Sequence, residues 1–218
     1  ISCKKECMPV ETIRWKNGVV ELVDQTLLPH RFKYIICRDV RKLWRAIKTL
    51  QVRGAPAIGI AGALGVVLGI WHSKQKTPEA FLKEVGSVCR YLASSRPTAV
   101  NLFWALGRME CVCRENVFRP PAEIKKILLR EALKIIDEDR RDCRAMAAHG
   151  ASLVKSGDTI LTHCNAGGLA TADYGTALGV LFEARKKGKR IKAYVDETRP
   201  LLQGARLTTW ELMRQGID

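Results

Sequence analysis

The C-terminal part of the chain alternates between short apolar runs and longer helical patterns, and this alternation restricts the fold more than any other feature. In order, the patterns predict a strand over 157–164, a helix over 172–187, a strand over 189–196, a helix over 206–214 and the start of another strand at 216–218. Strands that alternate with helices of this length form βαβ units of a parallel sheet, in which ligands bind near the carboxyl ends of the strands. We therefore expect a Rossmann-like α/β domain here.

The N-terminal part shows mainly helical patterns after one short hairpin. Apolar residues alternate on either side of Asn17-Gly18, which is the strongest short-range hairpin signal. Helices are predicted over 39–53, with Asp39 as the N-cap, and over 55–71, 78–94, 100–119 and 122–148.

A double proline at 120–121 predicts the boundary between two domains. The first, 1–121, is expected to be mostly helical with the small β-hairpin, and the second, 122–218, to be the Rossmann-like domain. Because a parallel sheet of so few strands leaves an edge and a face uncovered, we expect this second domain to be truncated in the present sequence.

The charge pattern argues against nucleic acid as a partner. Among the 218 residues, 37 are Lys or Arg and 22 are Asp or Glu, for a formal net charge of +15. The basic residues are spread over the whole chain and do not form one stripe interleaved with aromatic residues. The charge therefore favours a small anionic ligand or a well-solvated surface over nucleic acid.

Two further patterns bear on location. The longest apolar stretch, Ala55 to Trp71, is rich in glycine and lies at the lower length limit for crossing a bilayer, so we predict a buried helix and no membrane association. Residues 1–11 lack the apolar core of a signal peptide, which predicts a cytoplasmic location.

The eight cysteines are scattered through a chain that is large enough to fold without disulfides, so free thiols are predicted. The closely spaced pairs at 3 and 7 and at 111 and 113 lack a second pair with zinc-ligand spacing. We therefore expect no metal.

Cys164 follows a predicted strand and precedes a helix, within Thr162-His-Cys-Asn-Ala-Gly-Gly168. A thiol there would lie near free backbone amides and the positive end of a helix dipole, which can tune its acidity or hold an anion. The alternative is a buried cysteine that packs as a small hydrophobic residue, as most free cysteines do.

Two loops that enter helices carry groups that could form part of a binding site. In Arg53-Gly-Ala-Pro-Ala-Ile-Gly59, small residues allow close approach of the backbone, and the arginine offers paired donors. The segment Asp196-Glu-Thr-Arg-Pro-Leu-Leu-Gln-Gly-Ala-Arg206 concentrates charge after a strand, which is typical either of a site or of a salt-bridged turn. Arg96 lies at a helix break, where a surface arginine is the simpler interpretation.

Four segments together, Arg53–Gly59, Ser95–Leu102, Thr162–Gly167 and Asp196–Arg206, resemble the methylthioribose-1-phosphate isomerase family, in order and over nearly the whole chain. The resemblance implies an aldose-ketose isomerase of methionine salvage that converts 5-methylthioribose 1-phosphate to 5-methylthioribulose 1-phosphate. It also implies a small sugar-phosphate substrate, no cofactor and a homodimer.

The resemblance further implies roles for individual residues. Cys164 would be catalytic, moving a proton or hydride between C1 and C2, whereas Arg53, Gly54, Ala55, Arg96 and Gln203 would bind the substrate, the arginines chiefly at its phosphate. The family's second catalytic group is an aspartate in a segment that follows the Gly-Ile-Asp at 216–218, so Asp218 is not that residue.

Two related functions stay open. A ribose-1,5-bisphosphate isomerase would need a second anion site instead of an apolar pocket for the methylthio group. A regulatory α, β or δ subunit of the guanine nucleotide exchange factor for translation initiation would bind without turnover.

Overall fold

The computed structural model describes residues 10–218 of the chain and divides them into two compact units. The helical unit consists of Ile13–Thr26 and Lys33–Glu138, and the sheet unit of residues 10–12, Leu27–Phe32 and Asp139–Asp218. The predictions for Cys3 and Cys7 lie outside the described residues, as does most of the stretch 1–11 that lacks a signal-peptide pattern. The domain boundary at 121/122 stays a prediction about which parts of the chain fold independently.

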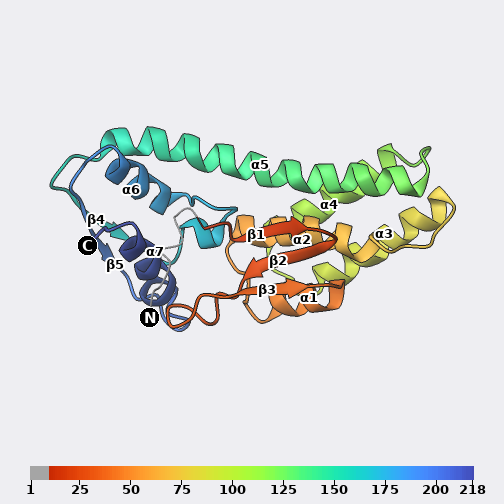
Figure 1. The fold of residues 1–218 in the computed structure, drawn as a ribbon, viewed down its shortest axis with the longest axis horizontal. Helices are drawn as coiled ribbons and strands as arrows, with labels where there is room; N and C mark the ends of the chain where they lie inside the picture. The colour runs from red at the N-terminus through yellow and green to blue at the C-terminus, as the bar shows by residue number, and fades with distance from the viewer. Residues whose placement is uncertain (1–9) are drawn as a thin grey trace. The chain divides into compact units, whose positions relative to one another are not determined.

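A three-stranded antiparallel sheet opens the helical unit (Figure 1). The predicted hairpin is confirmed, because β1 (Ile13–Lys16) pairs with β2 (Val19–Val23) across a two-residue turn at Asn17-Gly18. The third strand, β3 (Tyr34–Cys37), was not predicted and pairs with the other edge of β2. Helices α1 and α2 pack against this sheet.

Four helices of the unit follow the predicted pattern closely. They are α1 (Val40–Lys48), α2 (Ala55–Ile70), α3 (Pro78–Ala93) and α4 (Val100–Glu115). As predicted, the Asp39 carboxylate accepts a hydrogen bond from the Lys42 N–H and caps α1. Helix α1 ends earlier than expected, at Lys48, and the chain turns at Leu50 in the left-handed region.

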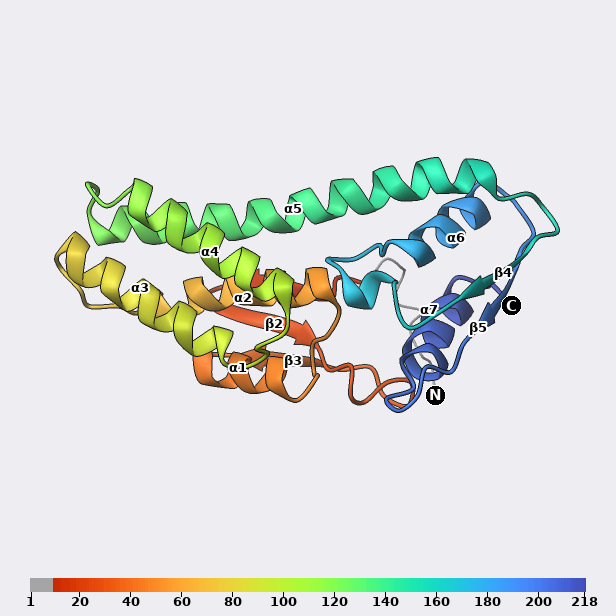
Figure 2. The same ribbon diagram turned by 180° about the vertical axis from the view of Figure 1, so that it is seen from behind.

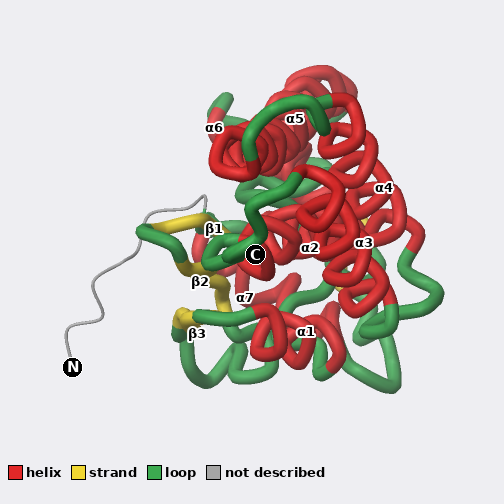
Figure 3. Tube along the Cα trace, turned by 90° about the vertical axis from the view of Figure 1, so that its right-hand side faces the viewer, coloured by secondary structure: helices red, strands yellow, loops and turns green. Residues whose placement is uncertain are grey.

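Helix α2 is the core of the helical unit, and α3 and α4 lie beside it (Figure 2, Figure 3). Every residue from Ala57 to Leu68 is buried, as expected for a helix that is apolar on all sides. A Cβ atom at Gly62 would lie 2.7 Å from a Leu102 methyl carbon of α4, so glycine sets how closely these two helices approach. The burial of this whole stretch confirms the prediction of a buried helix.

No helix among residues 10–218 combines the length and apolar character that crossing a bilayer requires.

Helix α5 (Pro121–Leu153) extends five residues beyond its predicted end, and its residues from Asp139 onward belong to the sheet unit. Strands β4 (Thr159–Thr162) and β5 (Lys192–Val195) form a two-stranded parallel sheet, connected through α6 (Ala177–Lys186). Helix α7 (Thr209–Arg214) follows β5. The expected α/β fold class with a parallel-sheet C-terminal part is confirmed.

One face of the parallel sheet packs onto a core supplied by α5, α6 and α7. Its buried residues are Ala151, Leu178, Leu181, Phe182, Ala184, Ile191, Leu212 and Ile217. The other face carries Leu161 and Tyr194, which are 68% and 71% exposed. The alternation of buried and exposed side chains along both strands is that of a sheet covered on one side.

Three boundaries in the sheet unit differ from expectation. The helix predicted to begin at 172 begins at Ala177, because a 3-10 turn over Gly168–Ala170 and a bridge between Gly167 and Gly175 occupy the preceding residues. The helix predicted to begin at 206 starts with a π-helical turn over Gly204–Thr208. No strand forms at 216–218, although the Ala193 N–H donates to the Asp218 carbonyl at 2.7 Å.

Two segments that flank the hairpin in sequence are held by the sheet unit. The Thr12 N–H and hydroxyl donate to the carbonyls of Ala172 and Gly168. The Arg206 guanidinium donates twice to the Leu28 carbonyl. Phe32 stacks on Trp210 with ring centroids 5.7 Å apart.

Candidate active site

Cys164 lies just beyond the carboxyl end of β4 and is half-exposed. Its backbone adopts φ +60, in the left-handed region that a non-glycine residue enters at a cost of about 1–2 kcal/mol. A strained residue of this kind persists only where its surroundings hold it, and such residues concentrate at functional sites. Cys164 is therefore not a fully buried hydrophobic residue, and its functional role stays a prediction.

Two threonines from the chain after β5 hold the Cys164 backbone. Its N–H donates to the Thr198 hydroxyl oxygen at 3.0 Å, and its carbonyl accepts from the Thr208 hydroxyl at 2.6 Å. The two threonines reach Cys164 because β4 and β5 are parallel neighbours. The loops that leave the carboxyl ends of these strands therefore lie at the same edge of the sheet. Sequence reasoning did not single out either threonine.

A buried polar pair lies directly behind Cys164. The Asn165 amide nitrogen donates to Glu211 Oε1 at 2.8 Å and to the Thr208 hydroxyl oxygen at 3.2 Å. Glu211 of α7 has no exposed surface, and Asn165 is 4% exposed. Glu211 was not identified from the sequence as part of the site, because it is a single polar residue between Trp210 and Leu212.

His163 and Asp196 form a second polar pair at the same sheet edge. Their side chains meet at 2.9 Å between His163 Nδ1 and Asp196 Oδ2. Both side chains are exposed. His163 directly follows the last residue of β4, and Asp196 directly follows the last residue of β5. The charged segment after β5 therefore begins with a contact between Asp196 and a histidine of the neighbouring strand end.

Gln203 lies at the entry to the π-helical turn, within the sheet unit that also holds Cys164. Its Oε1 atom is buried and makes no hydrogen bond to the part of the chain that the structure describes. An unsatisfied buried acceptor is uncommon and calls for an explanation, such as a ligand that donates to it.

The other predicted substrate-binding residues belong to the helical unit. Arg53 precedes α2, Gly54 is its N-cap with φ +92, and Ala55 is its first residue. Arg96 lies between α3 and α4, and its Nη1 atom is buried without a hydrogen-bond partner among residues 10–218.

Helices α2 and α4 begin at the same end of the helical unit. Gly59 lies against Asn101, and Gly62 against Leu102 and Leu106, so the two helices run in the same direction. Neither helix has a side-chain cap at its N-terminus. Two uncapped N-termini, each preceded by an arginine, give this end of the unit several amide donors for an anion.

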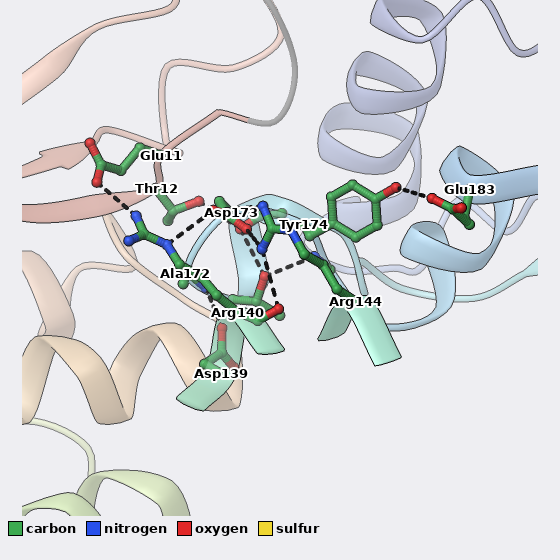
Figure 4. A network of polar contacts seen from close by, with 12 residues as sticks. Glu11, Thr12, Asp139, Arg140, Arg144, Ala172, Asp173, Tyr174 and Glu183 are labelled. Carbon is green, nitrogen blue, oxygen red and sulfur yellow. Dashed lines mark hydrogen bonds and ion pairs between the residues drawn. The ribbon is translucent and has the colours of Figure 1, made fainter. Parts of the chain in front are cut away.

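A polar network fixes the segment that follows the Cys164 loop (Figure 4). Arg140 and Arg144 of α5 pair with the Asp173 carboxylate, and Asp139 accepts from the Ala172 N–H at 2.7 Å. Burial raises the pKa of the Asp139 carboxyl, while the bond from Ala172 opposes this effect. The network ties α5 to the segment that begins at the 3-10 turn.

The six cysteines within the described residues are free thiols, in agreement with the prediction for these positions. Four of them, at positions 37, 89, 113 and 143, are buried. Burial raises the pKa of Cys37 and of Cys113 to about 11. No three His, Cys, Asp or Glu side chains of residues 10–218 gather in a way that could hold a metal ion.

Residues 51–218 match the sequence profile of the Initiation factor 2 subunit family. The 5-deoxyribose 1-phosphate isomerase of Moorella thermoacetica is 53% identical over 209 residues, which cover 96% of this chain and 60% of that protein. The methylthioribose-1-phosphate isomerase of Geobacter sulfurreducens is 50% identical over 96% of this chain and 61% of its own length. The chain thus spans about 60% of the length of these curated relatives.

Two solved structures are similar over nearly all of the chain. The 5-methylthioribose 1-phosphate isomerase of Pyrococcus horikoshii OT3 has a TM-score of 0.90 and 40% identity, covering 99% of this chain and 62% of that one. The translation initiation factor eIF-2B, subunit delta, from A. fulgidus has a TM-score of 0.87 and 45% identity, covering 96% and 61%.

Proposed function

Because the chain belongs to the Initiation factor 2 subunit family, we propose that it contributes to an aldose-ketose isomerase whose substrate is a pentose 1-phosphate. The proposed reaction converts 5-methylthioribose 1-phosphate to 5-methylthioribulose 1-phosphate, a step of methionine salvage. The names of the relatives from Geobacter sulfurreducens and Pyrococcus horikoshii support this choice of substrate.

The single observation that carries an enzymatic role is the strained backbone of Cys164 at the carboxyl end of a parallel strand. Cys164 is the proposed catalytic residue. Isomerisation moves one hydrogen between C2 and C1 after the sugar ring opens, and a thiol held in a fixed orientation can take part in that transfer.

Arg53, Gly54, Ala55 and Arg96 are the proposed phosphate-binding residues. Their support is the pair of uncapped helix N-termini and the unsatisfied buried nitrogen of Arg96. Bidentate arginine contacts would hold the phosphate in one orientation. Gln203, with its unsatisfied buried oxygen, is proposed to accept a hydrogen bond from a substrate hydroxyl.

Cys164→Ala in the complete protein is expected to lower kcat for methylthioribose 1-phosphate by roughly a hundredfold or more, because the group that moves hydrogen is lost. Turnover is measured directly, beside Cys111→Ser as the matched control. Cys111 is an exposed thiol on α4 and should tolerate the change. Normal turnover by Cys164→Ala would remove this cysteine from the mechanism.

The substrate is tested by side-by-side turnover of methylthioribose 1-phosphate, 5-deoxyribose 1-phosphate and ribose 1,5-bisphosphate. The first two share the 1-phosphate and differ in the group on C5, so their ratio measures recognition of the methylthio group. A preference for ribose 1,5-bisphosphate would identify the other isomerase considered for this sequence.

A second candidate is a non-catalytic subunit of a translation initiation factor. The 45% identity to the chain from A. fulgidus favours it. Absence of isomerase activity together with co-purification in a complex of several different subunits would establish this function.

We further propose a cytoplasmic location and a homodimer, which fractionation and sedimentation of the complete protein would test.

A further inference from the structure

We propose that Glu211 is a positioning residue that keeps Cys164 in its left-handed conformation through Asn165 and Thr208. The proposal rests on the proposed role of Cys164 as the catalytic residue. Glu211 would not itself contact the substrate.

The Glu211 carboxylate is the fully buried end of this arrangement. Its Oε1 accepts from the Asn165 amide at 2.8 Å, and its Oε2 accepts from the Leu169 N–H at 3.4 Å. An added Cβ atom at Gly167 would overlap the carboxylate, so the backbone after Cys164 folds directly onto it. The carboxylate thus anchors the loop at two points, one on each side of Gly167.

Thr208 connects this anchor to Cys164. Its hydroxyl donates to the Cys164 carbonyl at 2.6 Å and accepts from the Asn165 amide at 3.2 Å. Because the Asn165 side chain is held by Glu211 and Thr208 at once, Asn165 cannot move without breaking a buried hydrogen bond. Cys164 directly precedes Asn165, and its own carbonyl is held by Thr208, so a change of its left-handed conformation would disturb these contacts.

A carboxylate suits this position better than an amide would. Both groups that reach Glu211 in these contacts are N–H donors, and each of its two side-chain oxygens accepts from one of them. A glutamine has one acceptor and one NH2 group, so one donor would face another donor in a buried site. Replacing Glu211 by glutamine therefore preserves the shape of the side chain but weakens its hydrogen bonds to the loop after Cys164.

The test uses the complete protein and compares Glu211→Gln with Thr208→Val, which removes the hydroxyl at nearly constant volume. Both are expected to lower kcat at least tenfold while KM changes less than about threefold, because the thiol loses its orientation and the phosphate contacts remain. Both should also raise the rate at which iodoacetamide alkylates Cys164 by at least fivefold relative to Cys111, measured residue by residue by mass spectrometry.

Unchanged kcat and unchanged Cys164 alkylation in the two variants would overturn the proposal, even if the melting temperature falls, because a purely stabilising residue would give that result. If Glu211→Gln does not fold, Thr208→Val alone decides. If Cys164→Ala keeps full turnover while Glu211→Gln still changes the alkylation rate, the proposed catalytic role fails and the positioning of the thiol stands.

Discussion

Cys164 depends on groups that lie more than thirty residues away in sequence. Thr198 and Thr208 satisfy its backbone N–H and carbonyl, and both follow the next strand of the sheet. The segment around Cys164 was recognisable in the sequence from its place after a strand. Its partners were not, because a threonine hydroxyl near a loop carries no periodic signal of what it will contact.

The cysteines should differ widely in reactivity at the residue scale. Burial raises the pKa of Cys37 and of Cys113 to about 11, so near pH 8 their thiolate fraction is about a hundredfold below that of an ordinary thiol. Cys164 is half-exposed and should be alkylated first among these three. Time-resolved labelling of the folded protein measures this order, and labelling in denaturant, where all thiols should react alike, is the control.

Helix α4 illustrates what holds elements together within the helical unit. Arg108 of α4 binds Glu131 at 2.6 Å and pairs with both oxygens of Glu138, and both glutamates belong to α5. The helices themselves were predicted from periodicity, since apolar residues at helical spacing need only the local chain. The salt bridge was not predicted, because the two glutamates lie 23 and 30 residues from Arg108 in sequence.

Arg108→Ala is expected to lower the free energy of unfolding by about 2 kcal/mol, because two partly buried carboxylates would lose their shared cation. Urea denaturation measures the difference. Arg114→Ala is the matched control on the same helix. The Arg114 side chain is 68% exposed and pairs with Glu110 one turn away, so its loss should change stability by less than about 0.5 kcal/mol. Equal effects of the two substitutions would contradict this account of the α4–α5 contact.

At the scale of the whole molecule, the compact units do not follow the order of the chain. Residues 10–12 and Leu27–Phe32 belong with the sheet unit, although the hairpin between them belongs with the helical unit. The hydrogen bonds of Thr12, the Arg206 contacts to Leu28 and the Phe32–Trp210 stack account for this. A composition shift such as the double proline at 120–121 gives no information about contacts of this kind.

A fragment comprising residues 122–218 should therefore be less stable alone than in the presence of a peptide spanning residues 10–32. The peptide would restore the contacts to Ala172, Trp210 and Arg206. Thermal unfolding followed by circular dichroism should show a higher midpoint with the peptide, and a peptide carrying Thr12→Val and Phe32→Ala should have a smaller effect. Identical midpoints with and without the peptide would show that the predicted domain folds independently.

The sequence by itself determined the α/β class, the hairpin, the buried glycine-rich helix and the position of Cys164 after a strand, because these follow from local periodicity, turn residues and chain order. Only the tertiary structure revealed the left-handed Cys164 backbone, the buried Glu211 behind it and the buried atoms of Arg96 and Gln203 that have no hydrogen-bond partner among residues 10–218. These depend on which distant groups meet once the chain has packed, and neither hydrogen-bond partners nor burial is specified by the residues adjacent in sequence.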